Sequence, residues 1–195
     1  MNKKNILIVS ALEVETQGQL EDWRVLHTGV GKVNATLELT KVLQKAHLHY
    51  MPPMPELVIN YGTAGSRKIK KKTLVDCTKF IQRDMDVTGL GFMRGETPFE
   101  KEPPLMLEAK SDFNPIGRNA TCGTGDCFVE DKSQYYGEVV DMEAYALAKV
   151  CHHFDVPFIS FKYITDGADE QAHDDWEANL ADGIVEFKEQ ILKEI

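Results

Sequence analysis

Long apolar runs and a positive charge excess are both missing from this sequence. Uncharged stretches such as residues 5–12 and 57–66 fall far below the ~20 apolar residues of a membrane-spanning helix. The chain carries 22 Lys and Arg against 31 Asp and Glu, a formal net charge of −9. An acidic surface repels nucleic-acid phosphates and anionic lipid. We therefore expect neither a membrane nor a nucleic acid as a partner.

Cysteine is scarce, and several familiar motifs are missing. The four cysteines form no CxxC pair, and the adjacent His152 and His153 would point to different faces of a helix. Residues 29–32 (GVGK) fit neither the Walker spacing nor GxGxxG, and GxSxG does not occur. We expect reduced, buried cysteines in a cytoplasmic protein, with no metal site and no cofactor.

Strand-like and helix-like patterns alternate along most of the chain. Strands are predicted at residues 5–10, 24–32 with a terminal glycine turn, 56–66, 74–82, 138–140 and 157–165. Helices are predicted at 34–47, at 144–151 with Asp141 as N-cap, and at 174–195 with Trp176 on the apolar face. Residues 1–15 are interpreted as a first strand and not as a signal peptide. Alternation of this kind predicts one α/β domain over residues 1–195, a central mixed, mostly parallel β-sheet flanked by helices.

Glycine and proline are frequent between residues 83 and 119. Such a composition favours an irregular excursion over the surface, of the kind that often carries binding residues.

Acidic residues follow the carboxyl ends of three predicted strands. Glu13 and Glu15 follow the first strand, Glu143 follows residue 140, and Asp166 ends the strand at 157–165. Ligands of open α/β sheets bind at this edge, although acids there also cap helices. Glu143 is expected on the inward face of its helix, where a carboxylate needs a partner. Neighbouring backbone or a pair of ligand hydroxyls, such as a ribose diol, would supply one.

Several segments together resemble the nucleoside phosphorylase/nucleosidase superfamily, and most closely its 5′-methylthioadenosine/S-adenosylhomocysteine nucleosidases. They are SALEVE (10–15), TGVGKVNA (28–35), VINYGTAG (58–65), DVTGLG (86–91), GTGDCFV (123–129), VVDMEAYALAKVCHHFDVPF (139–158) and ITDGAD (164–169). The pairing of the DMEA helix start with the TDGAD strand end is the specific part of this resemblance.

The resemblance implies hydrolysis of a purine nucleoside, within purine nucleoside metabolism and methionine salvage. Glu15 would orient the attacking water, Asp166 would protonate the departing base, and Glu143 would grip the ribose 2′- and 3′-hydroxyls. The other implied substrate-binding residues are Met142 beside the sugar, Phe128 and Val129 at the base, Thr63, Ala64, Gly65 and Thr165 near the ligand, and Val87 and Leu90 across a homodimer.

Two alternatives stay open. A phosphorylase would use phosphate in place of water and would need arginine to bind it, for which Arg67, Arg83 and Arg94 are the candidates. A non-catalytic nucleoside-binding protein could share the same fold. The stretch between residues 91 and 123 is shorter than in typical members of the superfamily, which leaves the exact nucleoside open.

Overall fold

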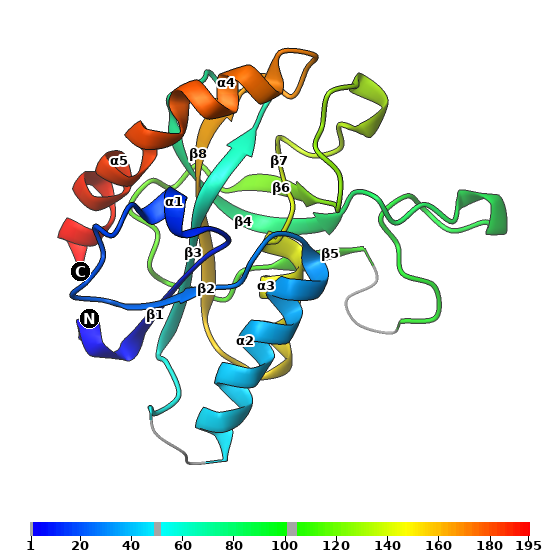
Figure 1. Cartoon of the computed structure of the whole chain (residues 1–195). Helices are drawn as coiled ribbons and strands as arrows, with labels where there is room; N and C mark the ends of the chain where they lie inside the picture. Colours follow the sequence, from blue (N-terminus) through cyan, green and yellow to red (C-terminus); the bar gives the residue numbers. More distant parts are fainter. Residues whose placement is uncertain (1, 49–51, 101–104) are drawn as a thin grey trace.

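The computed structural model describes residues 2–48, 52–100 and 105–195, whose strands form one mixed sheet (Figure 1). The strands are β1 (Ile6–Ser10), β2 (Arg24–His27), β3 (Leu57–Gly65), β4 (Leu74–Gln82), β5 (Met106–Glu108), β6 (Ala120–Thr124), β7 (Val139–Asp141) and β8 (Phe158–Asp166). The α-helices are α1 (Glu13–Thr16), α2 (Lys32–His47), α3 (Ala144–His153), α4 (Ala172–Asn179) and α5 (Gly183–Gln190).

The sheet is mostly parallel, as the alternating pattern predicts. β1 pairs in parallel with β2 and β3, β3 with β8, and β6 with both β4 and β7. β4 pairs antiparallel with β5 and β8, and β3 meets β7 antiparallel at Gly65 and Val140. β8 therefore lies between β3 and β4, although it is the last strand in the sequence.

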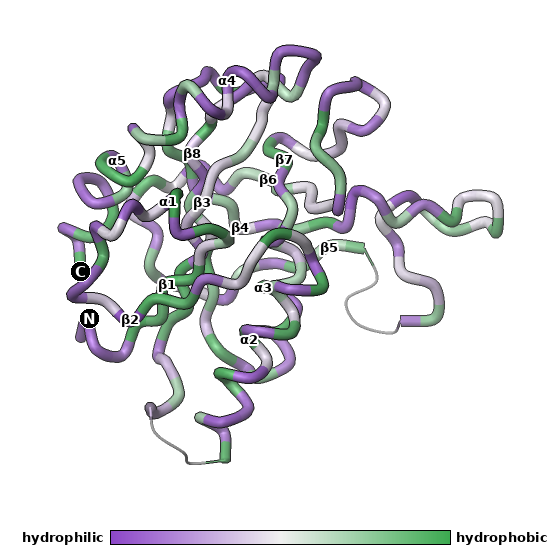
Figure 2. The backbone as a smooth tube through the Cα atoms, in the orientation of Figure 1, coloured by the Kyte–Doolittle hydropathy of each residue, from purple (hydrophilic) through white to green (hydrophobic). Residues whose placement is uncertain are grey.

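Strand alternation divides the core between the two faces of the sheet. Leu7 and Val9 of β1 pack in the cluster that includes residues of α2 and α3, whereas Ile6 and Ile8 pack in the cluster that includes residues of α5. Successive side chains of a strand point to opposite faces, so a fully apolar run such as β1 needs helices on both sides. Figure 2 shows hydrophobic and hydrophilic residues alternating along α2, whose apolar side covers one of these faces.

The C-terminal segment differs from the prediction of one helix over residues 174–195. It contains α4 and α5, joined by a 3₁₀ turn at Leu180–Asp182. Gly183 explains the closeness of this segment to the sheet: an added Cβ there would lie 2.7 Å from the Tyr61 Oη and 2.8 Å from the Tyr163 ring. The spacing of apolar residues along the sequence does not predict this contact between Gly183 and the sheet.

The prediction of Asp141 as the N-cap of α3 is also wrong. Glu143 occupies the N-cap position, and Asp141 ends β7. Asp141 still reaches the helix, because the amide of Ala144 donates to its Oδ2 at 2.9 Å.

The described part of residues 83–119 is largely irregular, as expected, except for β5 and a 3₁₀ turn at Thr88–Leu90. The segment after β4 extends away from the sheet as an arm (Figure 1). Within the described ranges, no helix has the length and apolar character needed to span a bilayer.

Candidate active site

A cavity of about 270 Å³ opens where β1, β3, β7 and β8 end. Nine of the predicted site residues line it: Glu15, Thr63, Ala64, Gly65, Phe128, Val129, Met142, Glu143 and Asp166. β1, β3 and β8 are parallel neighbours, so their carboxyl ends meet at one edge. This topology brings together acids that are up to 151 positions apart in the sequence (166 − 15).

Glu15 is held by four hydrogen bonds in the first turn after β1. Its Oε2 accepts from the Ser10 hydroxyl at 2.8 Å and from the Leu12 amide at 3.1 Å. Its Oε1 accepts from Thr63, from the amide at 2.8 Å and from the hydroxyl at 2.9 Å. A carboxylate offers about four acceptor positions, and here donors fill them all. The side chain is 4% exposed, so its orientation is set by these contacts.

Glu143 faces the cavity from the start of α3. The amide of Gly31 donates to its Oε1 at 2.8 Å. This contact gives the GVGK turn a role that its sequence does not suggest, since the turn holds a carboxylate and not a phosphate. Burial, followed by the charge of Asp141, raises the pKa of Glu143 to about 8.

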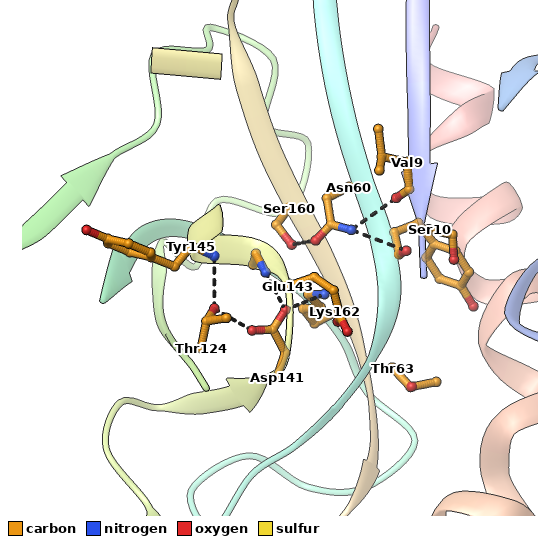
Figure 3. A network of polar contacts seen from close by, with 12 residues as sticks. Val9, Ser10, Asn60, Thr63, Thr124, Asp141, Glu143, Tyr145, Ser160 and Lys162 are labelled. Carbon is orange, nitrogen blue, oxygen red and sulfur yellow. Dashed lines mark hydrogen bonds and ion pairs between the residues drawn. The ribbon is translucent and has the colours of Figure 1, made fainter. Parts of the chain in front are cut away.

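A buried ion pair lies behind Glu143. Lys162 Nζ contacts Asp141 Oδ2 at 2.8 Å, and the Thr124 hydroxyl donates to Asp141 Oδ1 at 2.5 Å (Figure 3). Although burial opposes ionisation of both groups, the Lys162 ammonium keeps the pKa of Asp141 low and Asp141 raises the pKa of Lys162. Lys162 was not predicted; a lysine inside an apolar strand was the available signal.

Asp166 ends β8 with both carboxyl oxygens occupied. Thr165 donates its hydroxyl to Oδ2 at 2.8 Å, and the amide of Ala168 donates to Oδ1 at 2.9 Å. Burial raises the pKa of Asp166 above the usual aspartate range, which favours the protonated form. Thr165 is fully buried and does not itself line the cavity.

Arg83, Val87 and Leu90 come from the segment that follows β4. Val87 and Leu90 lie on the arm and do not line the cavity of their own chain. Arg83 does line it, although its guanidinium donates to the carbonyls of Gly125, at 3.1 Å, and Cys127.

Sequence reasoning missed several other residues that line the cavity. Cys127, expected to be a buried core thiol, is one of them, while Cys77, Cys122 and Cys151 are free and buried as expected. Trp176, predicted to share the apolar face of the last helix, instead directs its indole N–H to the Thr63 hydroxyl at 3.0 Å. The remainder are Ala11, Leu12, Val30, Val140, Asp141 and His173. No group of three or more potential metal-ligating side chains occurs among the residues that the structure describes.

Solved structures with the same fold include enzymes that act on nucleosides. Futalosine hydrolase of Helicobacter pylori matches with a TM-score of 0.82 and 22% identity over 99% of each chain. A mutant of the Helicobacter pylori 5′-methylthioadenosine/S-adenosylhomocysteine nucleosidase, with 5′-methylthioadenosine in its active site, matches with 0.81 and 23% over 100% of each chain. The corresponding nucleosidase of Colwellia psychrerythraea, in complex with adenine, matches with 0.77 and 20%, covering 98% of this chain and 93% of that one.

At these identities the likeness to solved structures establishes the fold. The family model described as the phosphorylase superfamily matches residues 16–194, almost the whole sequence. The chain therefore belongs to the phosphorylase superfamily.

Proposed function

We propose that this protein is a purine nucleosidase, which hydrolyses the N-glycosidic bond of a nucleoside of the methylthioadenosine/S-adenosylhomocysteine type. The observation that carries the proposal is the placement of three buried carboxyl groups, Glu15, Glu143 and Asp166, around one cavity. Its volume of about 270 Å³ is close to the lower end of the ~300–1,000 Å³ typical of small-molecule sites.

Asp166 is the proposed general acid. Breaking the bond between ribose and purine leaves the bonding electron pair on the base, which must receive a proton. Because burial raises the pKa of Asp166, this carboxyl group is suited to carry that proton. Phe128, which is 40% exposed at the cavity wall, would stack on the base, and Val129 would contact it through its backbone.

Glu15 is the proposed base. A water molecule attacks C1′ on the face opposite the leaving purine, and Glu15 takes a proton from it as the new bond between oxygen and carbon forms. Glu143 hydrogen-bonds the ribose 2′- and 3′-hydroxyls and holds the sugar in place. Met142 packs beside the ring.

The 5′-substituent is proposed to be an apolar thioether. Leu12, Val30 and Trp176 are uncharged residues of the cavity lining, and contact with them suits such a group. The similar structures of a nucleosidase with methylthioadenosine and of a futalosine hydrolase support purine nucleosides as a class.

The second candidate is a phosphorylase, which the cationic Arg83 in the cavity wall favours. Hydrolysis fits better because both terminal nitrogens of Arg83 already have partners, Nη1 with the Cys127 thiol at 3.2 Å and Nη2 with backbone carbonyls. In addition, the carboxylate of Glu15, the proposed general base, would repel phosphate.

The test is a panel of purine nucleosides assayed for free base with and without inorganic phosphate. We expect base release without phosphate, and losses of ~10²–10⁴-fold for Asp166→Asn and for Glu15→Gln with the fold retained. Base release that requires phosphate would establish the phosphorylase instead. Tight nucleoside binding without base release would establish a binding protein and overturn the proposed hydrolysis.

A homodimer and a cytoplasmic location belong to the same proposal. The arm exposes apolar side chains that a partner subunit would cover, among them Leu90 at 75% and Phe99 at 93%. The four free cysteines are compatible with a reducing compartment.

A further inference from the structure

A continuous chain of hydrogen bonds joins α4 to Glu15, the proposed general base. The indole Nε1–H of Trp176 donates to the Thr63 hydroxyl oxygen at 3.0 Å, and that hydroxyl donates to Glu15 Oε1 at 2.9 Å. An indole nitrogen is a donor only, so Thr63 must accept from it. The single hydroxyl proton of Thr63 is then directed to Glu15, which fixes the direction of the whole chain.

Both ends of this hydrogen-bond chain are tied to the sheet. Thr63 belongs to β3 and also donates its backbone amide to Glu15 Oε1 at 2.8 Å. Asn179, the last residue of α4, donates its side-chain amide to the Thr165 carbonyl at 2.8 Å, which anchors α4 to β8. Trp176 is therefore held beside Thr63 by a helix that is itself tied to the sheet.

Glu15 has no acceptor position to spare in this arrangement. Donation from a water molecule requires one of the four donors around its carboxylate to turn away. The amides of Leu12 and Thr63 are fixed by the backbone, whereas the hydroxyls of Ser10 and Thr63 can rotate. Ser10 donates to Oε2, so Thr63 is the rotatable donor on Oε1, and its contact with Trp176 bears on how Oε1 is presented to water.

We propose that Trp176 is a positioning residue, which acts through the Thr63 hydroxyl to orient the carboxylate of Glu15. This inference rests on the proposed function, in which Glu15 activates water. The position of α4 then affects the proposed reaction as well as the shape of the cavity. A movement of this helix would change the hydrogen bonds that the Glu15 carboxylate accepts.

A double-mutant cycle on base release tests the proposal. Trp176→Phe removes the indole N–H and keeps an aromatic ring, while Thr63→Val removes the hydroxyl and keeps the backbone amide. We expect each single variant to lower kcat about tenfold, because each removes one hydrogen bond from the chain that ends at the Glu15 carboxylate. The double variant should be no slower than Thr63→Val, and Thr63→Ser should restore the rate. Losses that multiply, or an effect of Trp176→Phe on KM alone, would overturn the proposal.

A spectroscopic measurement separates this proposal from the proposed function. The chain has 2 tryptophans, so a ¹⁵N-labelled sample gives an indole N–H signal from Trp176 and a reference signal from Trp23. We expect Thr63→Val and Glu15→Gln to shift the Trp176 signal and leave the Trp23 signal in place. A Trp176 signal insensitive to both variants rejects the chain even in an active enzyme. If the Trp176 signal shifts in both variants but the protein releases no purine base, only the nucleosidase function is rejected, and the hydrogen-bond chain stands.

Discussion

Burial changes the ionisation of Glu143 within the pH range in which proteins are usually studied. It is 8% exposed, and burial together with the nearby Asp141 raises its pKa from the ordinary 4.5 to about 8. Between these two values the folded protein holds a proton that the unfolded chain releases. Folding therefore binds a proton over this range, and stability must fall as the pH rises through it.

This linkage gives a measurable prediction. Between pH 6 and 8 the free energy of unfolding of the wild type should fall relative to that of Glu143→Gln, by up to ~1.4 kcal/mol per pH unit. The glutamine keeps the shape and cannot ionise. Urea unfolding of both proteins at several pH values provides the comparison, and parallel stability curves would contradict the raised pKa.

Gly65 is a second position where one atom decides the geometry of the site. A Cβ at this position would overlap the Oδ1 of Asp166 and lie 3.2 Å from the Ala168 Cβ. We expect Gly65→Ala to slow base release at least ~10²-fold, because the proposed acid must move, and to destabilise the fold by ~1–3 kcal/mol. The wild-type protein is the reference for both measurements. A Gly65→Ala variant that releases base at the wild-type rate would show that the position of Asp166 is not critical.

Residue identity predicted only part of the candidate site. The acids were found because carboxylates after strand ends are a local pattern and parallel topology gathers those ends. Trp176 was assigned to an apolar helix face because its spacing fits one, while its hydrogen bond to Thr63 depends on where α4 lies in space. Cys127 lines the cavity from the irregular stretch after β6, whose path no periodicity encodes.

At the scale of elements, the buried strands and α2 were predictable because apolar runs and helical spacing are properties of a few consecutive residues. The separation of α4 from α5 was not, since it depends on the packing of Gly183 against Tyr61 and Tyr163. The three-residue strand β5 is likewise defined by pairing with β4 and not by its own sequence.

The buried ion pair between Asp141 of β7 and Lys162 of β8 joins these two strands, and breaking it should lower the stability of the fold. Asp141 and Lys162 are 1% and 2% exposed, so removal of one charge leaves the other buried without compensation. We expect Lys162→Met to cost ~3–5 kcal/mol of stability, and Asp141→Asn added to it to recover part of the loss. Urea unfolding measures both. A double variant less stable than Lys162→Met would contradict this account.

At the scale of the whole molecule, the arm after β4 carries large apolar side chains that are exposed to solvent in the single chain. Leu90, Met93 and Phe99 are 75%, 60% and 93% exposed, values unusual for large apolar residues that lie close in sequence. An apolar surface of this kind is typical of an interaction site.

We expect the protein to sediment as a dimer and Leu90→Asp to shift it toward the monomer. Val33→Asp, on the exposed start of α2 and 76% exposed, is the control for a charge placed on the surface at large. If Val87 and Leu90 complete the partner's site, the Leu90 variant also loses base release. A wild-type protein that remains monomeric at high concentration would refute the dimer.

The central place of β8 has a consequence for how the protein comes into being. This strand fills the gap between β3 and β4 and carries both Lys162 and Asp166, yet it is made only after some four-fifths of the chain has been synthesised. Until it arrives, the edges of β3 and β4 that pair with β8 are open, and the acid at position 166 does not exist. If the proposed function holds, a chain that ends before β8 lacks the general acid, and the onset of turnover during refolding should report the insertion of this strand.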